Sequence, residues 1–414
     1  MSSLSKPLKL GVTGLGGYAA IICQDLLVNG HSDSPFVSLA AVCEPDLVTH
    51  EEKAHELRSK GVTVVQKFDD LLNLKLDGVW LPLPIPLHRS YTELALEAGI
   101  PVMCEKPAAG CVQDVDAMIA ARDRAELPVA IGFQDIYKPT TTTIKRALLD
   151  GAIGKIESVT LTACWPRDSS YYGRSSWAGK LKQDGSWVMD SPASNALAHF
   201  INLALFMLGG DGGSASPKSV EAELYRVNAI ENYDTCAFRF WTESDVDLIV
   251  CYTHACRQVH DPRLVIIGDR GRIIYDTGHE AVIETSTGSE TISLHVNPHL
   301  NMIERFANLL TGEKDERAVA TLEIARAHLV AVNGASEATP VYDIGKQLID
   351  VIPMANGARL LALPNIEQIF DQCALERRLP SELRTVDWAR KAGCKNLVGY
   401  NVFEGPLQLN GAVH

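Results

Sequence analysis

The first segment with recognisable chemistry is a glycine-rich turn near the N-terminus. Residues 8–19 read LKLGVTGLGGYA, an apolar strand that runs through glycines into a helix. In a dinucleotide-binding fold the first glycine permits a tight turn, the second lets backbone approach a pyrophosphate, and a small third residue, here Ala19, lets helix pack on strand. The turn predicts a dinucleotide site. The residues expected to contact the cofactor here are Gly14, Gly16, Gly17 and Tyr18.

A carboxylate, Glu44, follows the second apolar run. It lies 44 − 16 = 28 residues beyond Gly16, because a polar insertion at residues 29–38 lengthens the connection. A carboxylate at this place accepts bonds from the adenosine ribose hydroxyls and repels a 2′-phosphate. We therefore expect NAD as the cofactor, with NADP disfavoured. The alternative is an exposed glutamate that starts the next helix.

The elements that position these residues alternate along the first part of the chain. Short apolar runs separated by helical stretches are typical of βαβ units and a parallel sheet. The sequence predicts an N-terminal Rossmann domain, α/β and doubly wound, over residues 1–132. The expected strands are residues 8–13, 37–43, 62–65, 78–81, 102–104 and 129–132.

After residue 150 longer strands follow one another without helices, which indicates an α+β domain with a large, mainly antiparallel open sheet. We assign it to residues 133–345. Helices are expected at 193–208, 299–310 and 320–334, and a mostly helical extension at 346–414. The expected strands are residues 155–165, 219–227, 235–241, 246–254 and 263–267.

The fifth apolar run closes with Glu105-Lys106-Pro107, which resembles the Glu-Lys-Pro motif of the Gfo/Idh/MocA oxidoreductases. Pro84 to His88 resembles that family's Pro-x-x-x-His turn, and Ile153-Gly154-Lys155 its entry to the second domain. The resemblance spans about residues 8 to 340. It implies that Pro84, His88, Glu105 and Lys106 line the cofactor site, with Lys106 beside the nicotinamide and the substrate hydroxyl.

Oxidising a carbinol requires a group that takes the hydroxyl proton while a hydride leaves carbon, and a lysine with a depressed pKa can do so. Lys106 is the candidate, because ligands bind at the carboxyl ends of parallel strands. The alternative is a solvated loop lysine.

A second polar group lies at the expected helix over 193–208. Asn195, His199 and Asn202 fall at i, i+4 and i+7, so they point from one helical face. His199 occupies the histidine of the family's Asp-x-x-x-His pattern, but Asn195 stands where the family has Asp. Asp190, one turn earlier, is the candidate replacement, so we expect Lys106, His199 and Asp190 to be catalytic. The alternative for His199 is a core histidine.

Aromatic residues interleaved with Arg167, Arg174 and Lys180 precede that helix. Such rings suit a pocket that stacks apolar sugar faces while bonding hydroxyls, although core or interface positions are equally consistent with them. The family's common substrates, sugars and cyclitols, favour a carbohydrate. The expected substrate contacts are Trp165, Tyr171, Tyr172, Arg174, Trp177, Asn195 and His199.

Composition excludes other classes. A net charge of −13 disfavours nucleic acid and anionic membranes as partners, and no apolar run reaches the length of a membrane span. Ten scattered cysteines and no signal-like start indicate a cytoplasmic protein with reduced thiols. Cys251, His254, Cys256 and His260 lack paired ligand spacing, so no metal site is expected. The resemblance further implies a homo-oligomer formed through the C-terminal sheet.

These features predict an NAD-dependent dehydrogenase that moves a hydride between nicotinamide and a hydroxyl of a sugar, cyclitol or related polyol. Two alternatives stay open. One is an NAD-dependent glycoside-cleaving enzyme that oxidises a sugar carbon transiently, and the other is a non-catalytic dinucleotide-sensing regulator.

Overall fold

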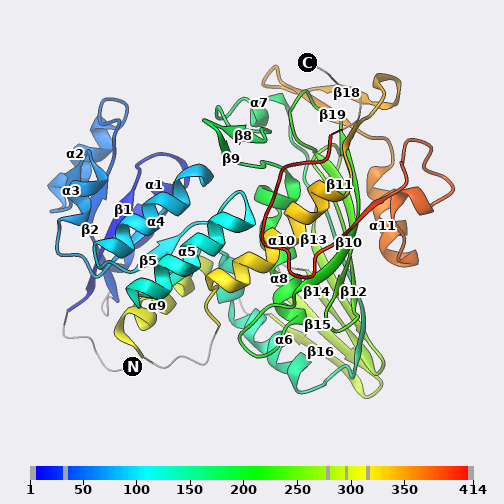
Figure 1. Cartoon of the computed structure of the whole chain (residues 1–414), viewed down its shortest axis with the longest axis horizontal. Helices are drawn as coiled ribbons and strands as arrows, with labels where there is room; N and C mark the ends of the chain where they lie inside the picture. The colour runs from blue at the N-terminus through cyan, green and yellow to red at the C-terminus, as the bar shows by residue number, and fades with distance from the viewer. Residues whose placement is uncertain (1–5, 31–35, 277–279, 294–296, 314–317, 409–414) are drawn as a thin grey trace. The chain divides into compact units, whose positions relative to one another are not determined.

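The computed structural model describes residues 6–30, 36–276, 280–293, 297–313 and 318–408 (Figure 1), so the predicted insertion at 29–38 lies partly outside the described residues. The chain forms two compact units. The first comprises Met1–Ala109, Asp114–Pro139 and Val296–Ala325, and the second comprises Gly110–Gln113, Thr140–His295 and Arg326–His414. Each unit combines three segments that are separate in the chain, whereas each predicted domain is one continuous stretch.

The first unit contains a six-stranded parallel sheet in the order β3-β2-β1-β4-β5-β6. Because β1 and β4 are neighbours, the strand order reverses between them, and in open α/β sheets ligands bind beyond the carboxyl ends at such a point. The predicted Rossmann sheet is confirmed. Its strands are β1 (Leu8–Thr13), β2 (Val37–Cys43), β3 (Thr63–Val65), β4 (Gly78–Leu81), β5 (Val102–Cys104) and β6 (Val129–Ile131).

Helices connect these strands, as the βαβ pattern requires. The chain returns to this unit far downstream with α9, whose apolar residues Met302, Ile303 and Phe306 are buried. The helices are α1 (Gly17–Gly30), α2 (Glu51–Ser59), α3 (Phe68–Leu72), α4 (His88–Glu97), α5 (Val112–Ala125) and α9 (Pro298–Thr311), with 3₁₀ turns at Ile85–Leu87 and Gln134–Tyr137.

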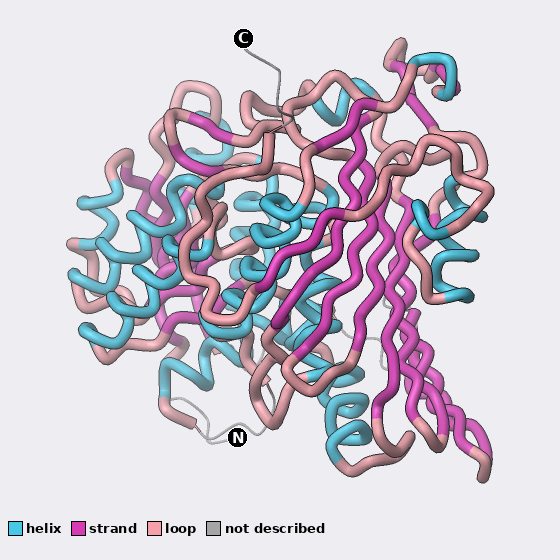
Figure 2. The backbone as a smooth tube through the Cα atoms, turned by 45° about the vertical axis from the view of Figure 1, so that its right-hand side comes forward, coloured by secondary structure: helices cyan, strands magenta, loops and turns pink. Residues whose placement is uncertain are grey.

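The second unit is built on a ten-stranded sheet, which Figure 2 shows as long strands side by side. Its path is β16-β15-β14-β13-β7-β12-β11-β10-β17, and β20 pairs with β10. Two pairs, β7 with β12 and β10 with β17, are parallel and the others are antiparallel, which confirms the predicted sheet. The strands are β7 (Ile156–Cys164), β10 (Pro217–Arg226), β11 (Thr235–Thr242), β12 (Asp247–Thr253), β13 (His260–Gly268), β14 (Gly271–Asp276), β15 (Glu280–Thr285), β16 (Gly288–Ile292), β17 (Val341–Asp343) and β20 (Gly393–Asn396).

The predicted helix over 193–208 begins differently. Pro192–Ala196 forms a π-helical turn, and the regular helix α8 covers Ala198–Leu208. Proline at the start and an N-terminal cap, in which the Ser194 amide donates to the Ser191 hydroxyl oxygen, favour this separate turn. Asn195 therefore does not share one regular helix with His199. The other helices of the unit include α6 (Pro139–Leu149), α7 (Ser169–Tyr172) and α10 (Leu322–Ala338).

The C-terminal extension, expected to be mostly helical, has only one α-helix among its described residues. The rest of its regular structure consists of three short strands, one of which is β20, and short 3₁₀ turns. Ile366, Phe370 and Cys373 of α11 pack with buried residues of the sheet that include Tyr225 and Ile249. The extension thus covers part of one sheet face. Its elements are β18 (Asp350–Pro353), β19 (Arg359–Ala362) and α11 (Ile366–Glu376).

Among the described residues, no helix is both long enough and apolar enough to span a bilayer.

Candidate active site

The glycine turn joins the end of β1 to α1. Gly14 and Gly17 have φ of +90° and +49°, a region that other residues rarely adopt. A Cβ on Gly14 would lie 3.2 Å from Cβ of Ala19, so the small residue at position 19 and the glycine are both needed for this close approach. The Gly14 amide donates to the carbonyl of Cys43 on β2 at 2.7 Å. The turn is thereby held at the carboxyl edge of the sheet.

Glu44 continues β2 and lies against that turn. One carboxylate oxygen accepts from the Leu15 amide at 2.7 Å and the other from the Asp46 amide at 2.8 Å. His50 Nε2 lies 3.9 Å from the same carboxylate. A carboxylate has about four acceptor positions, so two backbone bonds leave acceptor capacity. Glu44 therefore fixes the turn and still offers lone pairs at the place predicted for the ribose.

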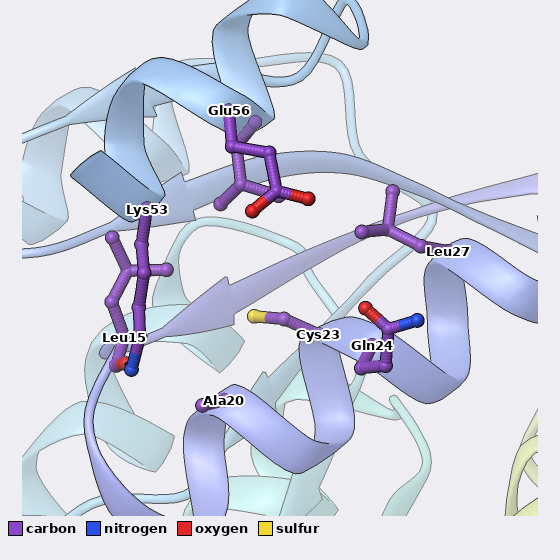
Figure 3. Close-up of a pocket in the computed structure, with 8 residues that line it drawn as sticks. Leu15, Ala20, Cys23, Gln24, Leu27, Lys53 and Glu56 are labelled. Atoms are coloured by element: carbon purple, nitrogen blue, oxygen red, sulfur yellow. The ribbon is translucent and has the colours of Figure 1, made fainter.

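A pocket of about 130 Å³ lies between α1 and α2 on the helix side of the turn (Figure 3). Lys53 extends from α2 and donates from Nζ to the Leu15 carbonyl at 3.0 Å. Cys23 points its sulfur into the space between the helices, and burial raises the pKa of this thiol to about 12. The thiol is therefore neutral at physiological pH. Of the residues that line the pocket, Lys53 holds the glycine turn by its bond to Leu15.

Glu105, at the end of β5, is a buried carboxylate with defined partners. It accepts from the Trp80 indole nitrogen at 3.0 Å and from the Lys106 amide at 3.3 Å. A Cβ on Gly132, after β6, would lie 2.4 Å from this carboxylate, so the site requires glycine there. Burial raises the pKa of Glu105, while Trp80 and the Lys106 charge oppose the rise.

Lys106 is half-buried and follows Glu105 directly, before a cis bond to Pro107. His88, the first residue of α4, spans two loops: Nδ1 lies 2.8 Å from the Pro107 carbonyl and Nε2 lies 2.8 Å from the Leu83 carbonyl. Burial lowers the pKa of His88, with a smaller contribution from Lys106. Pro84 starts the 3₁₀ turn that leads to His88. The predicted His88 thus supports the loop that presents Lys106.

Sequence reasoning missed a hydrogen-bonded chain at Tyr18. The Tyr18 hydroxyl lies 3.0 Å from Nε2 of His299 on α9, and Nδ1 of that ring lies 2.6 Å from the Asp25 carboxylate on α1. Burial raises the pKa of Tyr18, and the charges of Glu105 and Asp25 add to it. A protonated Tyr18 therefore donates to a ring whose other nitrogen donates to Asp25. The seven-residue spacing of Tyr18 and Asp25, which places them on one face of α1, was the available signal. The histidine that joins them is 281 residues beyond Tyr18 in the chain.

In the second unit Asp190 connects predicted residues. One oxygen accepts from Nδ2 of Asn195 at 2.8 Å, and the other accepts from the Gly179 amide at 2.6 Å and lies 3.4 Å from Arg174. Asp190 is only 3 % exposed. Asn195 stands where the family has an aspartate, and its side-chain amide holds the carboxylate of Asp190 in place.

The aromatic residues before α8 contact one another and the arginines between them. The Tyr171 ring contacts Tyr172 edge-on at 5.3 Å and Arg174 at 3.6 Å, and the same arginine lies 4.9 Å from the Trp177 ring. Trp165 meets Phe200 edge-on at 6.0 Å. These predicted substrate residues therefore cluster within the second unit.

His199 is the second residue of α8, and its ring centroid lies 6.1 Å from that of Phe200. His199 is half-buried, whereas Asn202 is fully buried. Lys106 belongs to the first unit and His199 to the second. Of the discounted cluster, His254 is buried with Nδ1 2.9 Å from the Trp165 carbonyl. The described residues contain no group of three or more His, Cys, Asp or Glu arranged to hold a metal ion.

Comparison with known families matches both units. Residues 8–133 match the model of an oxidoreductase family with an NAD-binding Rossmann fold. Residues 141–274 match the GFO/IDH/MocA C-terminal domain.

Among curated proteins, D-apiose dehydrogenase of Paraburkholderia graminis is 29% identical over 52% of this chain and 55% of that enzyme. The chain thus spans about half of that relative's length. Inositol 2-dehydrogenase of Rhizobium meliloti is 22% identical over 68% of this chain and 79% of that enzyme. The crystal structure of WlbA dehydrogenase from Bordetella pertussis in complex with NADH and UDP-GlcNAcA shares the fold, with a TM-score of 0.65, 20% identity and coverage of 80% of this chain and 95% of that one.

Proposed function

The chain belongs to the GFO/IDH/MocA oxidoreductase family, and from that premise we propose that it is an NAD-dependent dehydrogenase acting on a CH–OH group of a sugar, cyclitol or related polyol. The curated relatives named above act on apiose and inositol, which are substrates of this class. The observation that supports the proposal most directly is the placement of three features. Three strands of one parallel sheet, β1, β2 and β5, are followed at their carboxyl ends by the glycine turn, by Glu44 and by Glu105-Lys106, respectively.

The residues at this edge fit NAD. The left-handed Gly14 and Gly17 leave backbone amides of the turn unshielded by side chains, and nothing lies within 4 Å of a Cβ built on Gly17. The N-terminus of α1 follows and favours a pyrophosphate. Glu44 would hold the ribose hydroxyls, and a 2′-phosphate would meet its charge. NAD, when bound, accepts or returns the hydride.

In the proposed reaction the chain's own groups handle the proton. We assign to Lys106 the removal of the proton from the substrate hydroxyl, since the loop that presents it is fixed on both sides. The Lys106 amide donates to the Glu105 carboxylate, and His88 contacts the Pro107 carbonyl. His199 is the second acid–base candidate. Asp190, oriented by Asn195, would supply the carboxylate that the family places at position 195.

The test is a screen of aldoses, uronates and cyclitols for NADH accumulation, measured by absorbance, together with calorimetric titration of NAD and NADP. The proposal requires net NADH formation with one substrate class and tighter binding of NAD. Glycoside cleavage without net NADH would instead indicate transient oxidation. Binding of NAD with no turnover of any substrate would point to a sensor.

We also propose a cytoplasmic location and self-association through the sheet. All ten cysteines are free thiols, nine of them buried, as expected in a reducing compartment. Because α11 covers part of the face, the surface proposed for association is the row Val265, Ile274 and Val282, which are paired across β13, β14 and β15 and half-buried. Light scattering of the full chain and of Ile274→Lys tests this: a monomeric wild type would contradict it.

A further inference from the structure

Two guanidinium groups lie against one aromatic ring in the second unit. The Arg174 guanidinium carbon is 3.6 Å from the Tyr171 ring centroid, and that of Arg167 is 4.7 Å from it. Each gains from the ring by a cation–π interaction, but like charges on one ring repel each other. Asp190 lies 3.4 Å from Arg174 and balances that arginine, so the charge of Arg167 is the one that still needs an anion.

The carboxylates near this cluster already have partners, and none of those partners is Arg167. Asp190 lies 3.4 Å from Arg174 and accepts from Gly179 and Asn195. Asp168 accepts from the amides of Ser170 and Tyr171, and Asp261 accepts from the Trp165 indole. Buried Asp234 accepts from the backbone amide and the side-chain amide of Asn228.

Arg167 is the cation without a counterion. Among the residues that the structure describes, no carboxylate lies within the 4 Å of an ion pair with it, and its Nε is sealed from solvent without an acceptor. The neighbouring His254 adds no charge at neutral pH, because burial and then the two arginines lower its pKa to about 3. A partly buried guanidinium without a carboxylate partner is costly unless a ligand supplies the opposite charge.

Main-chain hydrogen bonds fix the backbone of the segment that carries Arg167. The Arg167 amide donates to the His254 carbonyl at 3.0 Å, and the Trp165 amide donates to the Thr253 carbonyl at 3.0 Å, so the segment continues the pairing of β7 with β12. Trp165 contacts Phe200, which adjoins His199. Arg174 connects through Asp190 to Asn195. The arginines thus flank the residues proposed to meet the substrate.

We infer that Arg167 and Arg174, stacked on Tyr171, bind an oxyanion of the substrate, so that the enzyme acts on an acidic sugar rather than a neutral polyol. This inference rests on the proposed function and names its substrate class. The planar fork of arginine matches carboxylate and phosphate oxygens in pairs, with Arg167 as the principal contact because Arg174 already has Asp190. A uronate or aldonate and a sugar phosphate share this chemistry.

The first experiment compares matched substrates. NADH formation is measured with D-glucose, D-glucuronate and D-glucose 6-phosphate, and with D-galactose and D-galacturonate. We expect kcat/KM for an acidic member to exceed that of its neutral partner at least ~10-fold. Preference for the uronates assigns a carboxylate, and preference for the phosphate ester assigns a phosphate. Equal or better turnover of the neutral sugars would overturn the inference while leaving the dehydrogenase intact.

The second experiment measures binding, so it does not depend on turnover. NAD-loaded protein is titrated calorimetrically with the same acids. Arg167→Gln should weaken binding of the preferred acid at least ~10-fold, Arg167→Lys should weaken it less, and NAD affinity should not change. Arg272→Gln, an exposed arginine on β14 paired with Glu284, is the matched control. If no acid binds the wild type, or if Arg167→Gln and Arg272→Gln bind alike, the inference is wrong. Failure to bind NAD would instead reject the proposed function.

Discussion

Gly132→Ala should damage the first unit through the Glu105 carboxylate. A Cβ at this position would lie 2.4 Å from one carboxylate oxygen and 2.6 Å from the other, so the group must retreat by about 1 Å to reach ordinary contact. Glu105 is 5 % exposed and has little space for such a shift. The retreat stretches the 3.0 Å bond from Trp80 beyond hydrogen-bonding distance.

The expected cost follows from the partners that are lost. A buried donor or acceptor left without a partner costs ~1–3 kcal/mol, and more where one group is charged, so Gly132→Ala should lower the free energy of unfolding by about 2–4 kcal/mol. Because the Lys106 amide also bonds to Glu105, kcat should fall as well. Chemical denaturation and turnover measure the two effects. Gly210→Ala, where no atom lies within 4 Å of the built Cβ, is the control.

A double-mutant cycle separates this mechanism from a general intolerance of alanine. In a Glu105→Ala background the new methyl group meets no carboxylate, so adding Gly132→Ala should cost little or nothing. Residues in direct contact show such non-additivity, whereas independent sites add. Equal costs of Gly132→Ala in both backgrounds would refute the reasoning.

Four other outcomes are expected. Lys106→Ala should lower kcat by ~10²–10⁴ with unchanged NAD affinity in calorimetry, and near wild-type turnover would reject its role as base. Asp190→Asn should lower kcat/KM at least ~10-fold in the same NADH assay, because it removes the carboxylate that Asn195 orients. Phe370→Ala should cost about 3–5 kcal/mol in denaturation of the full chain, since the ring is 1 % exposed. The pKa of His254 is about 3 in the folded chain against 6.5 normally, so the unfolded state binds more protons between these values; the free energy of unfolding should therefore fall as the pH drops below 6.5, by up to ~1.4 kcal/mol per pH unit. His254→Gln should make the free energy of unfolding depend less on pH in this range.

The parallel sheet could be predicted closely from sequence, because strands buried on both faces are continuous apolar runs. The predicted strands at 8–13 and 37–43 match β1 and β2 at both ends. Strand β20 could not be predicted in this way. Three of its four residues, Gly393, Lys395 and Asn396, are of types that are depleted in strands. It is a strand because residues 393–396 pair with β10 at 219–222.

The residues of the site likewise differ in how well the sequence predicts them. Motifs with a fixed local conformation, such as the glycine turn and Glu105-Lys106, identify their own residues. Contacts made by distant segments do not, so His299 was missed although it bonds to Tyr18. Arg167 was noted among the aromatic residues but not selected, because only the structure shows that it stacks on Tyr171 and lacks an acid.

The C-terminal extension is a required part of the second unit, and a buried carboxylate shows why. Glu223 on β10 is 1 % exposed and accepts from the hydroxyls of Tyr225 and Ser381, each at 2.6 Å. The Tyr225 hydroxyl also accepts from the Arg390 amide at 2.9 Å. Burial raises the pKa of Glu223, and these donors oppose the rise. Removing the extension would take Ser381 and Arg390 away and expose the apolar face beneath α11, so the sheet that supports His199 depends on residues that the family models do not cover.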